Sequence, residues 1–272
     1  MTNRIAVRAT FSADGAASAT FALPTTRAPG DLMLAAVSTS NYTPTTPVGW
    51  TLESNVGTGT AGVAGSVGVW VYSRVVQAGD SNTINFSATG ADYIVVTGII
   101  LIGANATFID AVPTTNTTTP ASQTYTLASI TTVTANAWLV GFIAVDADST
   151  SARITAPLTN ATVIDETLQV SRSVSTGTGG QLFGQTGRLV TLGAAGALTR
   201  TETTTASISV SIQMAIRPAD STTLTVYQEA ARVVAKTPVP TLSTYQTTAR
   251  VVRSIATVTP PTQATPRIVI CM

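Results

Sequence analysis

The chain has 272 residues, of which 44% are hydrophobic and only 10% are charged, and its formal net charge is +1. A charge balance so close to neutral favours neither a nucleic-acid-binding protein nor one that binds acidic membranes. The sequence has no histidine, one cysteine and, in Lys236, one lysine. These counts exclude Ser-His-Asp and Cys-His catalysis and argue against a zinc site or a P-loop, so we expect no catalytic residue, no cofactor and no metal.

The composition predicts an all-β protein. About one residue in five is threonine, a β-branched residue that suits a pleated surface and loses side-chain freedom in a helix. Short apolar runs alternate with Gly, Pro, Asn, Asp and Ser at the spacing of a sandwich. We expect a jelly-roll-like antiparallel β-sandwich over residues 1–218 and a C-terminal extension of short strand repeats over residues 219–272. The best candidate for a helix is a short piece over residues 189–197.

The predicted strands follow one another through the first 218 residues. One of them, residues 207–216, alternates strictly between apolar and polar positions, which is typical of a strand with one face in a core. Residues 94–102 are apolar on both faces and predict a central strand that is covered on both sides. In chain order, strands are expected over residues 4–9, 17–21, 32–38, 50–55, 67–76, 82–87, 93–102, 123–127, 137–145, 162–170, 174–180 and 206–217.

The N-terminal residues 1–8 contain no continuous apolar segment, so we expect no secretory signal and a protein that is made in a cytoplasm. The longest uncharged apolar run, residues 93–104, has the length of a strand and is shorter than the roughly 18 residues that a membrane helix needs. We therefore expect no membrane insertion. The single cysteine, Cys271, excludes an intramolecular disulfide.

Carboxylates are the remaining catalytic candidates, because a glycosidase needs only two of them beside the scissile bond. Asp146 and Asp148 would share one face of a strand, where they could bind Ca²⁺ or act together. Asp165 and Glu166 form the other close pair. We favour the simpler interpretation that Asp146 and Asp148 belong to a polar turn after an apolar strand.

Several short motifs follow in a fixed order along the first 218 residues. They are Pro29-Gly-Asp-Leu-Met-Leu-Ala35, Gly49-Trp-Thr-Leu52, Val69-Trp-Val-Tyr-Ser-Arg-Val-Val-Gln-Ala-Gly-Asp80, Ile109-Asp-Ala111, Thr134-Ala-Asn-Ala-Trp-Leu-Val-Gly141 and the closing strand to Arg217-Pro218. Each motif alone is generic, but the ordered series resembles a diffuse family of lectin-like jelly-roll proteins encoded among the structural genes of tailed phages and prophages. The resemblance implies a decoration, minor tail or receptor-binding role, and it brings no catalytic residues.

The segment after Pro218 carries an internal repeat. The pattern Gln-x-x-x-Arg-Val/Ile-Val occurs three times, at intervals of 18 and 17 residues, with prolines between the copies. One such unit has too few apolar side chains to fold alone. The three segments either form a meander against the main domain or add strands to neighbouring subunits, and we favour the second. The residues expected to contact partner chains are Gln228, Arg232, Gln246, Arg250, Gln263 and Arg267.

These features predict a non-enzymatic structural protein of a tailed-phage virion, with capsid decoration or cement favoured over a tail location. The expected partners are other capsid or tail subunits and further copies of the chain in a homo-oligomer such as a trimer, without nucleic acid or membrane. The alternative is a carbohydrate-binding or host-receptor adhesin, in which Trp50, Trp70 or Trp138 stacks on a glycan instead of packing in the core. A carboxylate-only glycosidase is the weakest hypothesis.

Overall fold

The computed structural model describes residues 5–147, 152–174 and 179–219. These residues form strands and connections, with no helix among them. The chain divides into a unit of Met1–Thr223 and a unit of Leu224–Met272, and every described residue belongs to the first unit. The account below concerns this sandwich domain.

Two five-stranded antiparallel sheets form the centre of the domain. The order of the first sheet is β1 (Ala6–Gly15), β7 (Ile94–Ile102), β3 (Leu32–Thr39), β5 (Val67–Val75) and β4 (Thr51–Thr58). The order of the second is β12 (Val163–Val174), β13 (Gly180–Leu189), β11 (Ala137–Val145), β16 (Ser207–Pro218) and β8 (Ala104–Ser122).

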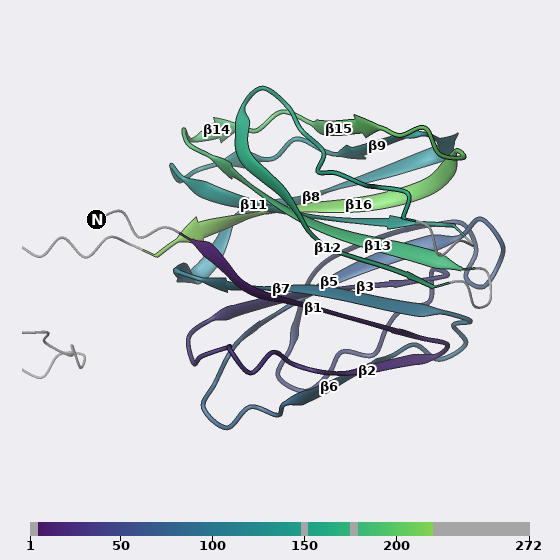
Figure 1. Ribbon diagram of the computed structural model, residues 1–272, viewed down its shortest axis with the longest axis horizontal. Coiled ribbons are helices and arrows are strands. Elements are labelled where there is room, and N and C mark those ends of the chain that lie inside the picture. The colour runs from purple at the N-terminus through teal and green to yellow at the C-terminus, as the bar shows by residue number, and fades with distance from the viewer. Residues whose placement is uncertain (1–4, 148–151, 175–178, 220–272) are drawn as a thin grey trace, which may run out of the picture. The chain divides into compact units, whose positions relative to one another are not determined.

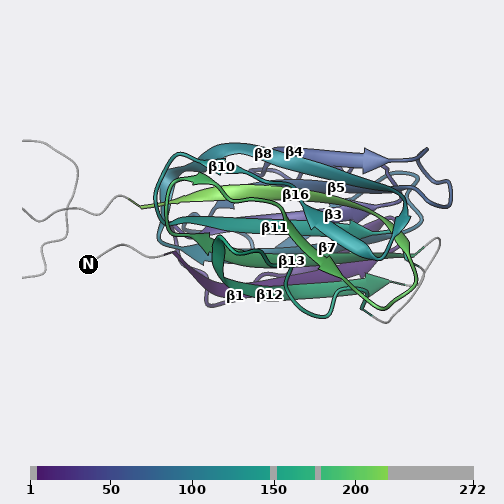
Figure 2. The ribbon, with the colours of Figure 1, turned by 90° about the horizontal axis from the view of Figure 1, so that it is seen from above.

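A smaller strand pair covers the outer face of each large sheet, so the domain has four layers (Figure 1). Strands β2 (Ser18–Ala22) and β6 (Thr83–Ser87) lie on the first sheet. Strands β9 (Thr124–Leu127) and β15 (Leu198–Thr201) lie on the second, next to the short pair β10 (Thr131–Thr132) and β14 (Gly193–Ala194). Seen from above, the long strands of both large sheets run along the same direction (Figure 2).

Three hydrophobic cores fill the spaces between these layers. Strand β3 contributes to two of them, because Leu32, Leu34 and Ala36 face the central core whereas Met33 and Val37 face the outer core of the first sheet. All eight residues of β3 are buried. A strand covered on both faces needs no polar side, which explains its continuous apolar run.

The two large sheets have the same strand order. From one edge to the other, the first sheet runs β1, β7, β3, β5, β4 and the second runs β8, β16, β11, β13, β12. Strands at the same place in these two orders also hold the same place along the chain of their own half. The outer pair β9–β15 matches β2–β6 in the same way. The domain therefore consists of two topologically equivalent halves, residues 5–103 and 104–219. Within each half the chain passes between the large sheet and the small outer pair.

The sequence carries a trace of this equivalence. Ser18-Ala-Thr-Phe-Ala-Leu23 on β2 and Ser122-Gln-Thr-Tyr-Thr-Leu127 on β9 share the pattern Ser-x-Thr-aromatic-x-Leu. In both copies the aromatic residue and the leucine are buried in the outer core of their own half. Matching residue types therefore occupy matching positions in the two halves.

The structure confirms the predicted all-β, antiparallel β-sandwich. Most predicted strands agree to within a few residues, but the helix expected over residues 189–197 is wrong. That segment turns at Gly193, which has a φ of 132°, and pairs as β14 with β10. The strand expected over residues 174–180 lies mostly outside the described residues, which leave out 175–178, between the end of β12 at Val174 and the start of β13 at Gly180. Strands β8, β10, β14 and β15 and most of β13 were not predicted.

The predicted partner-binding residues all lie outside the residues that the structure describes. These are Gln228, Arg232, Gln246, Arg250, Gln263 and Arg267. Their role therefore stays a prediction from the sequence repeat.

Candidate functional site

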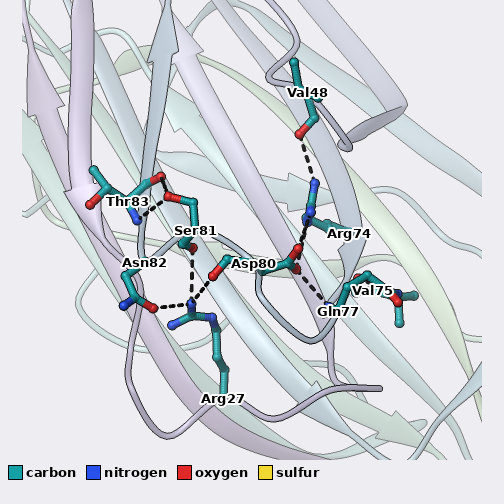
Figure 3. Close-up of polar contacts among 9 residues, drawn as sticks. All are labelled: Arg27, Val48, Arg74, Val75, Gln77, Asp80, Ser81, Asn82 and Thr83. Atoms are coloured by element: carbon teal, nitrogen blue, oxygen red, sulfur yellow. Dashed lines mark hydrogen bonds and ion pairs between the residues drawn. The ribbon is translucent and has the colours of Figure 1, made fainter.

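The candidate site is a shallow hollow of about 270 Å³ in the first half. It lies where the β2–β3 and β5–β6 connections meet, at the end of the sheet where β3 begins and β5 ends (Figure 3). The residues that line it are mostly polar: Thr25, Arg27, Pro29, Val76, Gln77, Ala78, Gly79, Asp80 and Asn82. A hollow of this size is slightly smaller than typical small-ligand sites, which measure roughly 300–1,000 Å³.

Arg27 joins the two connections. Its guanidinium group donates to the Asp80 carbonyl at 3.3 Å, to the Ser81 carbonyl at 3.1 Å and to Oδ1 of Asn82 at 2.6 Å. On its own connection it donates to the carbonyl of Pro24 at 3.1 Å. The planar fork of arginine suits this task, since it bonds several backbone oxygens at once. Arg27 therefore holds the wall of the hollow in place.

A second arginine fixes the β5–β6 connection from the other side. Arg74 on β5 forms a two-point ion pair with Asp80, with an Nε–Oδ2 distance of 3.0 Å and a second contact from Nη2 to Oδ1. The amide of Gln77 also donates to Oδ2 of Asp80 at 2.8 Å, and Nη1 of Arg74 donates to the Val48 carbonyl at 2.9 Å (Figure 3).

This pairing determines the charge state of both groups. The hydrogen bond to Asp80 raises the pKa of Arg74, and the same bond from Arg74 lowers the pKa of Asp80, aided by the Gln77 amide. A carboxylate that accepts this many hydrogen bonds is a poor general base, because its protonated form is disfavoured. Asp80 therefore acts as a charged anchor of the β5–β6 connection.

The equivalent place in the second half is built differently. There the matching connections pair with each other as β10–β14, through Thr131–Ala194 and Thr132–Gly193. Exposed apolar side chains flank this pair: Val133, Val190 and Leu192 are 63%, 43% and 64% exposed. The two segments that carry them lie side by side, because the Asn136 amide donates to the Val190 carbonyl at 3.1 Å and the Gly193 amide donates to Oγ1 of Thr132 at 3.2 Å. We call these three residues the apolar patch.

No protein-family model matches the chain, and no curated protein or solved structure shows significant similarity to it.

The carboxylate pairs considered from the sequence are only partly described by the structure. Asp146 follows the last residue of β11, and its amide donates to the Ile208 carbonyl at 3.0 Å, whereas Asp148 lies outside the described residues. Asp165 has a positive φ of 57° and pairs with Arg188 at 3.3 Å. These positions are consistent with structural roles.

A buried carboxylate that the sequence did not point to is Glu202. Its Oε1 accepts from the Thr155 amide at 3.0 Å and from Nε of Arg200 at 2.5 Å. Burial alone would raise the pKa of Glu202, but the hydrogen bonds from Arg200 and the Thr155 amide outweigh burial, and the pKa is lowered. Glu202 therefore holds the β11–β12 connection as a charged anchor.

Two of the three tryptophans are buried, which removes them as exposed sugar platforms. Trp50 and Trp70 are 6% and 4% exposed in the outer core of the first half, and Trp138 is partly buried against the central core. The interpretation that favoured core packing for these residues is correct for Trp50 and Trp70. A stacking site would need other aromatic residues.

Within the described ranges, no group of three or more Cys, His, Asp or Glu side chains is arranged to hold a metal ion. The same ranges contain no helix long and apolar enough to cross a bilayer.

Proposed function

We propose that the protein is a non-enzymatic structural component of a tailed-phage particle, with capsid decoration favoured over a tail location. The observation that carries the proposal is the apolar patch, together with the resemblance of the sequence to phage structural proteins. Clustered exposed apolar side chains on a soluble domain are typical of a protein–protein contact. The patch lies at the end of the domain where Ala6 pairs with Ile102 and where the Ala219 amide donates to the Gly103 carbonyl.

The use of charge in the domain also supports a structural role. Arg8–Asp31, Arg74–Asp80 and Arg200–Glu202 are ion pairs in which each carboxylate is no more than 8% exposed. Each of these carboxylates also accepts a backbone amide from a connection. Arginine and carboxylate groups are thus used to hold connections, which suits a rigid display scaffold.

The test is incorporation into particles. The full chain, a version that lacks residues 219–272 and the triple variant Val133→Ser, Val190→Ser, Leu192→Ser are added to particles that lack the protein, and bound protein is counted after sedimentation. We expect full binding by the chain, none by the truncated version and at least a tenfold loss for the triple variant. Val63→Ser serves as the matched control, because Val63 is 53% exposed but lies in the β4–β5 connection at the other end.

Normal incorporation of both altered proteins would remove the proposal. Because all four substituted side chains are exposed, the variants are expected to keep the stability of the parent, which thermal unfolding verifies.

The polar hollow favours a second candidate, a glycan-binding adhesin. Its wall offers hydroxyl and amide groups from Thr25, Gln77 and Asn82 beside Asp80, which are groups that bind sugar hydroxyls. A glycan array probed with the full chain tests this candidate. Saturable binding that is lost in Gln77→Ala and kept in Gln169→Ala, on distant β12, would favour the adhesin over decoration.

A further inference from the structure

The two halves of the sandwich domain share no strand ladder. Among the described residues, every strand pair and isolated bridge joins segments of the same half, 5–103 or 104–219. The backbone bonds outside the ladders follow the same division, except for the bond from the Ala219 amide to the Gly103 carbonyl at the junction of the halves. Backbone pairing therefore does not require the two halves to belong to one polypeptide.

Each half has an outer core of its own. The outer core of the first half draws its residues from 9–100, and that of the second half from 111–215. In the first half this core includes Phe21, whose ring lies 5.1 Å from that of Phe11 and 6.4 Å from that of Phe86. A half thus has a hydrophobic core that does not depend on the other half.

The central core is where the halves meet. Leu34, Val69 and Ile99 from the first half and Phe142 and Ile212 from the second are fully buried there. At the edge of this contact Arg172 of β12 forms an ion pair with Asp14 of β1. An apolar centre with a charged pair at its rim is the composition of a permanent subunit interface.

A single residue connects the halves. Strand β7 ends at Ile102 and β8 begins at Ala104, so Gly103 alone makes the turn from one sheet to the other. Gly103 is exposed and has a φ of 78°, a left-handed conformation that glycine adopts readily and other residues rarely do. Short connections of this kind allow the exchange of equivalent elements between copies.

We propose that the central face of each half can bind the complementary half of a second copy, so that opening at Gly103 converts the closed monomer into a half-exchanged dimer. In that dimer each first half packs against the second half of the other chain, and the contacts of the central core are re-formed. The closed and exchanged forms then differ mainly in the conformation of residue 103 and in the entropy of association. This proposal does not depend on the proposed function.

The first experiment changes the length of the connection in the full chain. Deleting Gly103 forces Ala104 or Ile102 into the turn, which should favour the open form, whereas inserting Gly-Ser-Gly after Gly103 should relax the turn and favour the closed form. We expect the deletion to double the mass of the parent species in light scattering, with an unchanged β-sheet circular dichroism spectrum, and the insertion to leave that mass unchanged. A folded deletion variant with the parent mass would overturn the proposal.

A second experiment covers the case in which the deletion variant does not fold. A protease site is inserted after Gly103 in the full chain, the folded protein is cut, and the products are denatured, mixed with an isotopically heavy cut copy and refolded. We expect native mass spectrometry to show light–heavy pairs of the two halves at the statistical ratio of about one half. The control carries its site at Gly62 in the β4–β5 connection, where a cut divides the first sheet.

The control should recover poorly, because its fragments must rebuild a ladder between β4 and β5. Failure of the hinge-cut halves to associate, or equal recovery of both cut proteins, would contradict the proposal. Particle binding is not used as a readout, so the outcome is independent of the proposed function.

Discussion

Asp80 shows how one side chain can decide the shape of a connection. Its carboxylate is 8% exposed and bonds Arg74 and the Gln77 amide, so removal of its charge leaves a largely buried guanidinium group without its partner. We expect Asp80→Asn to lower the free energy of unfolding by about 1.5–3 kcal/mol at pH 7, the range for hydrogen bonds to charged groups. Urea unfolding measures this loss.

The pKa of Asp80 also predicts a pH dependence. Because its pKa in the folded protein is lowered, the stabilisation that it contributes is present above the unfolded value of about 3.9 and is lost as the pH falls through the folded value. The difference between parent and Asp80→Asn should therefore be full at pH 7 and shrink steadily below about pH 4. A difference that stays constant down to pH 2 would show that the ion pair is not its source.

Asp165→Asn is the matched control for both measurements. Asp165 is also paired with an arginine, but its side chain is 48% exposed. An exposed ion pair contributes about 0–1 kcal/mol, so this variant should lie close to the parent at every pH.

Gly98 is a residue whose small size the packing requires. A Cβ atom at this position would lie 1.9 Å from Cζ of Phe11, in the outer core of the first half. We expect Gly98→Ala to destabilise the domain by about 1–3 kcal/mol, the usual effect of overpacking. In a double-mutant cycle, Phe11→Leu should recover part of the loss, and strictly additive effects would place the strain elsewhere.

At the scale of elements, the sequence predicted the strands whose residues alternate between apolar and polar or are all apolar. It missed strands that show neither pattern. Strand β8 contains Pro113 and Pro120 and a run of Thr and Asn, and no alternating apolar pattern marks it. It is an edge strand, where proline is tolerated and half of the backbone groups face away from the ladder. Strand β8 is held in the sheet by its pairing with one neighbour, β16.

Strand β13 was missed for the opposite reason. Gln181, Gln185 and Thr186 look like the residues of a polar loop, yet all three are buried. The structure shows that Gln181 accepts from the Arg153 amide and that Gln185 bonds both the amide and the carbonyl of Leu158. These partners come from the β11–β12 connection, which no local sequence pattern can reveal.

The candidate site was predicted only in part for the same reason. The motif that ends at Asp80 belongs to the ordered series of motifs in the sequence. The ion pair between Asp80 and Arg74, and the hydrogen bonds of Arg27 to residues at least 53 positions away, form only in the folded chain.

Gln185 gives a prediction at this scale. Its side-chain oxygen accepts from the Leu158 amide at 2.9 Å and its nitrogen donates to the Leu158 carbonyl at 3.1 Å. Gln185→Leu keeps the size of the side chain but leaves both buried backbone groups unpaired, at an expected cost of about 2–5 kcal/mol. Hydrogen exchange at Leu158 should rise sharply, while Gln169→Leu, on the half-exposed edge strand β12, should leave it unchanged.

At the scale of the domain, the four edge strands of the two large sheets restrict how copies can associate. Each of β1, β4, β8 and β12 carries at least one register shift in its ladder. Bulges bend and twist an edge and so hinder the addition of another strand. Association through the apolar patch or by exchange of halves is therefore favoured over the growth of either sheet.

The central core also determines whether the domain unfolds in one step. Phe142 is fully buried among residues of both halves, whereas Phe86 is fully buried in the outer core of the first half. Either Phe→Ala substitution should cost about 3–5 kcal/mol. Only Phe142→Ala weakens the contact between halves, so only this variant should unfold in two separated steps.

Two optical probes distinguish these outcomes. In a Trp138→Phe background, tryptophan fluorescence reports on Trp50 and Trp70, which are buried in the first half, while far-ultraviolet circular dichroism reports on both halves. In urea, the two probes should coincide for the parent and for Phe86→Ala and diverge for Phe142→Ala, with a lower slope for each separate transition. Coincident, equally steep transitions in Phe142→Ala would mean that the halves are one folding unit, because loss of their main contact would not have uncoupled them.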